Sequence, residues 1–144
     1  MTGLSLGIPM LLPIFAKVQK SFFTLFFSTR ANKGAGIDFV AFGGDTYETT
    51  ETDVQIFISK ETTLLKNNAE IPNNSSDNIL EITFRDDSAD IPSSKITVPA
   101  STTGSFSSGD IEVTILAGSK INEKVNRLGT GNITDVNILA ELEK

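Results

Sequence analysis

The sequence predicts an all-β protein, an antiparallel β-sandwich or barrel of about eight or nine short strands. Short segments alternate apolar with polar residues, and they follow one another at spacings of about 10–15 residues. Outside the first twenty residues, no long segment has the helical period. Because each regular segment has one polar face, two packed sheets would bury Ile, Val and Phe and leave Thr, Glu and Lys in water.

Composition narrows the class of protein. The chain has 144 residues, the length of one domain, and its 39% hydrophobic and 21% charged content is that of a folded protein. The net charge is −6 and the pI is near 4.6. A nucleic-acid surface needs clustered cations, and the close basic pairs are Lys17 with Lys20 and Arg30 with Lys33. We therefore expect no direct binding of nucleic acid.

The residue types for common catalytic chemistry are missing. The chain has no Cys, no His and no Trp, and Tyr47 is its one tyrosine. Disulfides and zinc-thiolate sites are thereby excluded, and the commonest general base and metal ligand is absent. Adjacent acids such as Asp86 and Asp87 are typical of solvated turns. We predict a protein that is not an enzyme, with no catalytic residue, metal site or cofactor.

The first twenty residues differ from the rest. They are rich in apolar side chains, are interrupted by Pro9 and Pro13, and end in cations. We expect an N-terminal arm whose interface residues are Leu4, Leu6, Ile8, Met10, Leu11, Leu12, Ile14, Phe15, Lys17 and Lys20. A signal peptide would carry its cations before the apolar run, and a membrane span needs about 20 apolar residues. An arm packed on its own domain or on a neighbour fits better, with shallow membrane contact and a processed leader as alternatives.

The strands begin after the arm. The segment from Ser21 to Ser28 (SFFTLFFS) is apolar on both faces, which indicates a strand buried on both sides or an oligomer contact. A second strand is expected over residues 37–42. The acidic stretch from Asp45 to Asp53 has carboxylates for calcium but lacks the glycine of a calcium loop. A solvated loop or sheet edge is the preferred interpretation.

The middle of the chain gives two regular strands and a loop. Val54, Ile56 and Ile58 alternate inward in the segment from Asp53 to Lys60, and Leu80 to Arg85 alternates in the same way. Leu64 and Leu65 mark a short strand or turn. The polar stretch from Asn67 to Asn78 is expected to be a surface loop.

The last third is the most regular. Ile96 with Val98, Ile111 with Val113 and Ile115, and a more polar run from Ile121 are separated by turns, which predicts an antiparallel meander with one buried face. After the turn at residues 127–132, the segment 133–144 has apolar residues at period two. A last strand there would pair with the first strand.

Part of this sequence resembles a segment that recurs in small single jelly-roll proteins of viruses, especially bacteriophages. The matching positions are Phe84 to Asp90, Ile96 to Ser107, Ala117 to Asn122 and Gly129 to Gly131. The resemblance covers roughly the last 60 residues and extends loosely to residues 26–42. Ser119 stands where the family often has an acidic residue, and the arm lies outside the common pattern.

The resemblance implies a single jelly roll of about eight strands over residues 21–144, with residues 1–20 as its apolar N-terminal arm. It further implies a virion structural protein, a capsid vertex (penton) or minor capsid subunit located in the virion. Such a subunit would assemble with itself and with other capsid proteins through its sandwich sides and its arm, and the arm could contact an internal membrane. The alternative is a receptor- or glycan-binding fibre or spike module, using the loops at 45–53 and 67–78. A third hypothesis, a membrane-anchored filament subunit, fits poorly because Pro9 and Pro13 would interrupt a helix.

Overall fold

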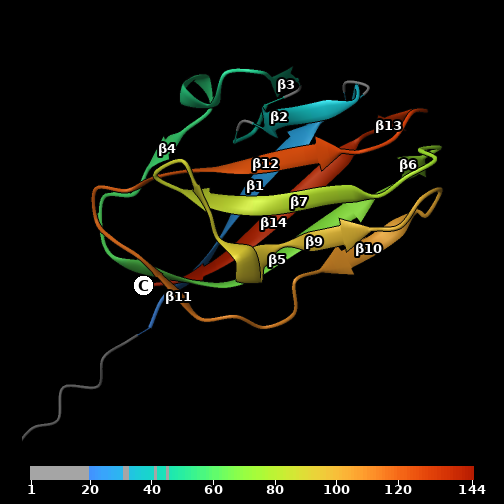
Figure 1. The fold of residues 1–144 in the computed structure, drawn as a ribbon. Helices are drawn as coiled ribbons and strands as arrows, with labels where there is room; N and C mark the ends of the chain where they lie inside the picture. The colour runs from blue at the N-terminus through green and yellow to red at the C-terminus, as the bar shows by residue number, and fades with distance from the viewer. Residues whose placement is uncertain (1–19, 31–32, 41, 45) are drawn as a thin grey trace, which may run out of the picture.

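The computed structural model describes residues 20–30, 33–40, 42–44 and 46–144, which form an antiparallel β-sandwich (Figure 1). The strands are β1 (Phe22–Thr29), β2 (Gly36–Val40), β3 (Tyr47–Glu48), β4 (Ile56–Phe57), β5 (Thr62–Ile71), β6 (Asn73–Asn74), β7 (Leu80–Asp86), β8 (Ala89–Asp90), β9 (Ile96–Val98), β10 (Gly104–Ser107), β11 (Val113–Ile115), β12 (Lys120–Arg127), β13 (Ile133–Thr134) and β14 (Val136–Glu143). Two short 3-10 helices, η1 (Glu51–Asp53) and η2 (Pro92–Ser94), lie between strands.

The connectivity of the two sheets is that of a jelly roll. The first sheet has the order β1-β14-β5-β10, and β11 also pairs with β5. The second has the order β3-β2-β12-β7-β8, with β4 beside β12 and β9 beside β7. If β10 and β11 are taken as one interrupted strand, the eight main strands are ordered 1-8-3-6 and 2-7-4-5. This is the double-sheet jelly roll, so the predicted fold class is confirmed.

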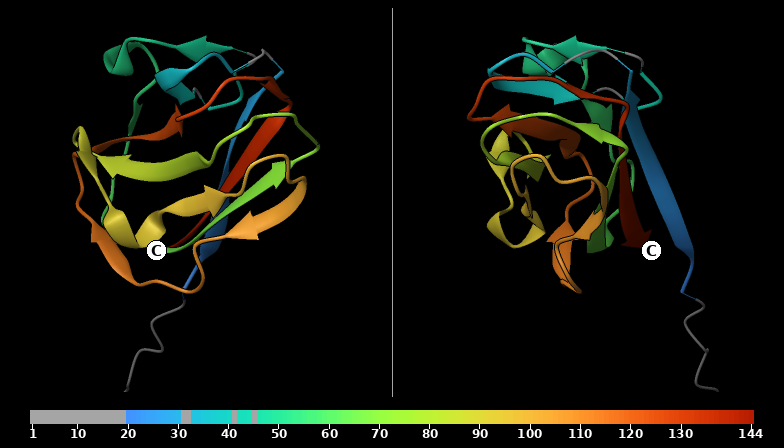
Figure 2. Two further views of the ribbon diagram at one scale, coloured as in Figure 1. Left: turned by 45° about the vertical axis from the view of Figure 1, so that its right-hand side comes forward. Right: turned by 90° about the vertical axis from the view of Figure 1, so that its right-hand side faces the viewer.

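The core lies between the two sheets (Figure 2). Strand β14 shows how the pattern produces it: Val136, Ile138, Ala140 and Leu142 alternate inward and are all buried. Strand β14 pairs with β1 from Phe22 opposite Glu143 to Thr29 opposite Val136. The expected pairing of the last strand with the first is therefore confirmed.

The expected meander is wrong. Strand β9 pairs with β7, β10 and β11 pair with β5, and β12 pairs with β7 and β2. These consecutive strands thus belong alternately to the two sheets. Alternation in a sequence reports which face of a strand is buried, and both sheets bury their apolar faces in the same core. It therefore does not identify the neighbouring strand.

The predicted loop from Asn67 to Asn78 is also wrong in its first part. Strand β5 runs from Thr62 to Ile71 through the middle of its sheet, and Asn67 is completely buried. A register shift opposite Glu141 and Leu142 marks a bulge in β5, which breaks the period-two pattern. The bulge and the inward-facing asparagine concealed this strand in the sequence. The loop itself begins at Pro72 and contains β6.

Three other expectations need smaller corrections. The segment 53–60 contributes only the two-residue strand β4, although Val54 and Ile58 are buried as predicted. The second strand ends at Val40, and its Ile37 is exposed. The polar run from Ile121 is β12, the centre of the second sheet, with Glu123 fully buried.

Candidate functional site

Strand β1 leaves phenylalanines exposed. Phe22 is 68% exposed, Phe26 is 41% exposed, and both point to the outer face of the sheet because they lie opposite Glu143 and Leu139. Burial on both faces is therefore wrong for the single chain, and an oligomer contact remains as the other interpretation. Phe23 points inward at the open end of the sandwich and is 37% exposed.

Exposed apolar side chains gather at this strand. Nine large ones are exposed among the described residues, and six of them lie on β1 or beside it: Phe22, Phe23, Phe26, Phe42, Phe57 and Leu139. We call these six side chains the β1 patch. Exposed apolar side chains gathered around one strand in this way mark contact with a protein or a membrane more often than scattered ones do.

One edge of β1 is open. Ser21 and Lys144 exchange both backbone hydrogen bonds, at 3.0 and 2.8 Å, so odd-numbered residues of β1 direct their N–H and C=O groups toward β14. Phe22 and Thr24 consequently direct theirs the other way, where no strand among the described residues pairs with them. Unpaired edge groups of this kind are a template for pairing with another chain.

The open edge ends at Phe26. Its carbonyl oxygen accepts the Gly43 N–H at 3.0 Å, and Phe27 forms an isolated antiparallel bridge with Phe42. The Phe27 and Phe42 rings meet edge to face, with centroids 6.1 Å apart. The segment at 42–43 thus covers the second half of β1, and the free part runs from Phe22 to Leu25.

A cleft of about 360 Å³ lies beside this free part, at the open end of the sandwich. Phe23 and Leu25 form one wall, and Ile56, Phe57 and Ile58 form the other. Lys60 and Lys144 also line it. The cleft is therefore an apolar groove with cations among its lining residues.

The base of the arm lies beside the same groove. Lys20 has a largely exposed side chain and forms an ion pair with the Glu143 carboxylate. The hydrogen bond and the charge of Glu143 raise the pKa of the Lys20 amine. The other predicted interface residues, Leu4, Leu6, Ile8, Met10, Leu11, Leu12, Ile14, Phe15 and Lys17, lie outside the described residues.

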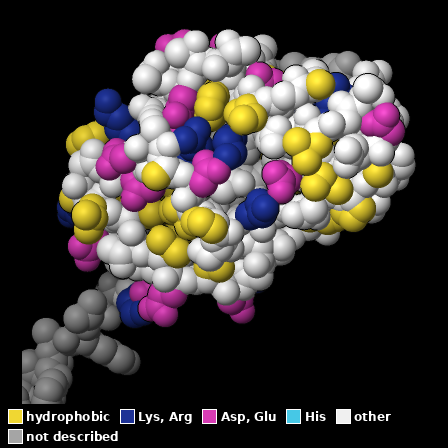
Figure 3. Space-filling view, viewed as in Figure 1, with side chains coloured by type: hydrophobic (Ala, Val, Ile, Leu, Met, Phe, Trp, Pro, Cys, Tyr) yellow, Lys and Arg dark blue, Asp and Glu magenta, His cyan; other side chains and the backbone are white. Residues whose placement is uncertain are grey.

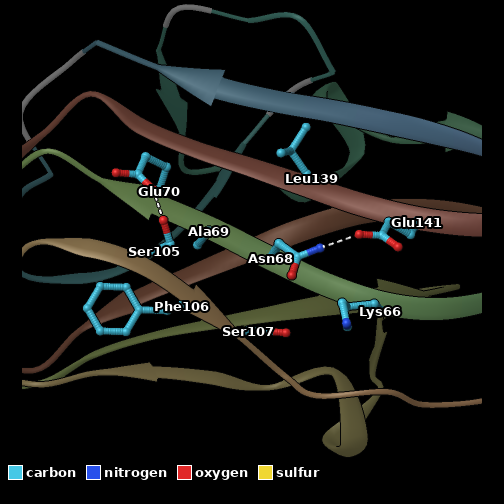
Figure 4. A pocket seen from close by; sticks show the side chains of 9 residues that line it. All are labelled: Lys66, Asn68, Ala69, Glu70, Ser105, Phe106, Ser107, Leu139 and Glu141. Atoms are coloured by element: carbon cyan, nitrogen blue, oxygen red, sulfur yellow. Dashed lines mark hydrogen bonds between the residues drawn. The ribbon is translucent and has the colours of Figure 1, made fainter.

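A second groove, of about 380 Å³, crosses the outer face of the first sheet (Figure 4). Its polar groups already bond one another or a near neighbour. Asn68 Nδ2 donates to Glu141 Oε1 at 2.8 Å, Ser105 donates to Glu70, and Lys66 Nζ lies 2.8 Å from Asp110 Oδ1. Side chains that are satisfied in this way offer a ligand few free donors or acceptors.

The opposite outer face, on the second sheet, carries paired charges. Figure 3 shows basic side chains lying among acidic ones over this sheet. Arg85 on β7 contacts Glu51 at 3.3 Å and Asp90 at 3.1 Å, and Lys124 pairs with Asp90. The guanidinium also lies over the Phe39 ring, 5.3 Å from its centroid. This face is a mixed-charge surface held by side-chain pairs.

Within the acidic stretch from Asp45 to Asp53, Tyr47–Glu48 form β3, which pairs with β2 at the edge of the second sheet, and Glu51–Asp53 form η1. Asp45 lies outside the described residues, and Glu51 is engaged by Arg85. Within the described ranges, no group of three or more acidic side chains could hold a metal ion. These residues also contain no helix long and apolar enough to cross a bilayer.

Two charged residues of the interior, Glu123 and Lys33, could not be recognised as buried from the sequence. Glu123 on β12 is fully buried, and this burial raises the pKa of its carboxyl group well above the usual range. Lys33 is also fully buried, with Nζ 2.6 Å from Asp38 Oδ2 and 2.7 Å from the Gly34 carbonyl oxygen. The Lys33 amine lies 5.6 Å from the centroid of the Tyr47 ring, and burial raises the pKa of the Tyr47 hydroxyl. Neither feature opens into the two grooves described above.

Comparisons with known proteins do not assign a function to the β1 patch or to either groove. No protein-family model and no curated protein sequence matches the chain. Among solved structures, the globular domain of zebrafish complement 1qA protein is similar, with a TM-score of 0.48 and 11% sequence identity over 86% of this chain and 96% of that chain. A similarity of this degree assigns neither a family nor a function.

Proposed function

We propose that this protein is a structural subunit of a virion, a jelly-roll protein at a capsid vertex (penton) or in a minor capsid position. It assembles with copies of itself and with other capsid proteins through the sides of its sandwich and its N-terminal arm. It is not an enzyme and needs no cofactor. The viral assignment rests on the resemblance of residues 84–131 to jelly-roll proteins of bacteriophages.

The β1 patch is the observation that carries the assembly role. A lone domain gains nothing from exposing Phe22 at 68% and Phe26 at 41%, because burying such a side chain is worth about 1.5–3 kcal/mol. A partner that covers the β1 patch recovers this free energy. The patch also lies next to Lys20, where the described chain begins, and we propose that arm and patch belong to one contact region.

The alternative, a receptor- or glycan-binding module, has weaker support. Its proposed binding surface consists of two loops, and one of them, the stretch from Asn67 to Asn78, begins within β5, where Asn67 is buried. The groove on the outer face of the first sheet has its polar groups paired with one another. Both observations favour assembly over ligand recognition.

The solution mass of the protein tests the proposal. Full-length protein is compared, by light scattering after size-exclusion chromatography, with a full-length variant in which Leu11, Leu12, Ile14 and Phe15 are all replaced by Ser. A discrete oligomer that dissociates in the variant, with unchanged circular dichroism and Tm, supports an assembling subunit. A monomer for both proteins at every concentration would overturn the proposal.

A further inference from the structure

We infer that the open edge of β1 is a strand-addition site, and that its occupant is residues 8–15 of the arm of a second copy of this chain. The inference rests on the proposed assembly role and specifies where the arm binds. Strand addition supplies main-chain hydrogen bonds for affinity and alternate side chains for specificity.

The acceptor edge is short and well defined. Phe22 and Thr24 each direct an N–H and a C=O outward that no described residue pairs with, which makes two donors and two acceptors. The Gly43 N–H already bonds the Phe26 carbonyl, so an added strand would stop there. The edge between Phe22 and Thr29 carries no charged side chain, whereas edges that must stay free usually carry charges that oppose pairing.

The arm has the sequence of a strand that pairs along one side only. Pro9 and Pro13 are four residues apart, so in an extended chain both nitrogens face the same side. If the even-numbered residues Ile8, Met10, Leu12 and Ile14 pair with β1, both prolines face away, where no donor is needed. The prolines then also prevent a further strand from adding outside the arm.

The side chains of such a strand match the two faces of β1. In an antiparallel pair, residues directly opposite share a face, so Met10 and Leu12 would join Phe22 and Phe26 on the outer face. The odd-numbered Leu11 and Phe15 would lie over Phe23 and Leu25, which wall the 360 Å³ cleft. The arm therefore supplies apolar side chains on both faces, as β1 itself does.

The length and direction of the chain favour a second copy over the same chain. Strand β1 continues straight into Ser21 and Lys20, which are held by Lys144 and Glu143 on the β14 side. The chain at Lys20 thus still runs along the axis of β1, so residues 8–15 would reach their own β1 only through a complete reversal of the chain before Lys20. Extended residues reach about 3.3–3.6 Å each, so the segment from Ala16 to Lys20 spans roughly 17 Å, enough to pass to an adjacent subunit.

One test removes the open-edge donor. Thr24→Pro deletes an N–H that faces away from β14, and Thr24→Val keeps the N–H while removing the hydroxyl. We expect Thr24→Pro to weaken assembly at least tenfold in dissociation constant, with a far-UV circular dichroism spectrum like that of wild type, and Thr24→Val to assemble as wild type does. Assembly of a folded Thr24→Pro variant at wild-type strength would overturn the inference.

A second test does not depend on tolerance of proline. The chain has no cysteine, so introduced cysteines can form disulfides only with each other. Two differently tagged chains are co-expressed, one with Thr24→Cys and the other with a cysteine at position 10, 11, 12, 13 or 14. We expect disulfide-linked heterodimers from the even positions and few from the odd ones, because odd-numbered side chains would lie on the opposite face.

The outcomes separate this inference from the proposed function. Equal linkage at even and odd positions would overturn the inference while leaving assembly intact. Oligomers that form with no linkage at any position would do the same. A protein that is monomeric throughout would overturn both.

Discussion

Asn67 and Glu123 face each other across the interior of the sandwich, with Asn67 Nδ2 3.3 Å from Glu123 Oε2 and neither side chain exposed. They come from opposite sheets, Asn67 from β5 and Glu123 from β12. Asn67 Nδ2 also lies 3.4 Å from the Ser94 carbonyl oxygen. A carboxyl group in this position has lost its water and has gained one amide donor.

We expect Glu123→Gln to stabilise the protein at neutral pH. Burial raises the pKa of Glu123 in the folded state above its unfolded value. Its contribution to stability is therefore complete below the unfolded pKa, about 4.3, and is lost as pH rises through the folded pKa. Glutamine keeps the shape and an amide that can bond Asn67, and it does not titrate. Urea unfolding at pH 4 and pH 7 should show a difference between variant and wild type that is larger at pH 7.

Glu81→Gln is the matched control for this prediction, since it removes one negative charge from a partly exposed ion pair with Lys95 on the outer face of β7. Surface pairs contribute about 0–1 kcal/mol, so we expect a small effect of this variant. If Glu123→Gln changed the free energy of unfolding equally at both pH values, titration of Glu123 would not be the cause of that change.

We expect Phe26→Ala and Phe27→Ala to affect different properties. Phe27 is fully buried, so its truncation should lower the free energy of unfolding by about 3–5 kcal/mol. Phe26 points to the outer face, so its truncation should cost less than about 1 kcal/mol but weaken assembly. Thermal unfolding measures the first effect and solution mass the second. A large loss of stability for Phe26→Ala under dissociating conditions would show that this side chain serves the fold of the single chain.

Individual strands could be predicted from the sequence where apolar side chains alternate, because burial of one face imposes period two. Strands β7, β9 and β14 have this pattern, whereas the pairing of β14 with β1 was expected because the first strand needs a partner. Strand β5 could not be predicted, because its bulge and the buried Asn67 break the period. The exposed edge of β1 could not be predicted either. The sequence shows that its phenylalanines need cover, and only the strand order shows which of them a single chain leaves uncovered.

The buried ion pair of Lys33 and Asp38 should respond differently to single and double substitution. Asp38→Asn leaves the fully buried Lys33 amine without its 2.6 Å partner, and an unpaired buried charge costs about 3–5 kcal/mol. Replacing both residues, with Lys33→Met and Asp38→Asn, removes both charges, so we expect it to cost less than Asp38→Asn alone. Equilibrium unfolding of the wild type, the two single variants and the double variant measures the coupling. Additive effects would contradict a specific pair.

Gly131 should tolerate alanine far less than Gly109 does. Both have positive φ, +90° and +80°, which costs an L-residue about 1–2 kcal/mol. At Gly131 a Cβ atom would also lie 2.3 Å from the Ser75 carbonyl oxygen, whereas at Gly109 nothing lies within 4 Å. The antiparallel pair of β6 and β13 lies next to this point, since Ser75 N–H donates to the Asn132 carbonyl oxygen at 2.8 Å. We therefore expect Gly131→Ala to lower the Tm clearly more than Gly109→Ala does, because the backbone at Ser75 must move. Equal shifts in calorimetry would show that positive φ alone governs both positions.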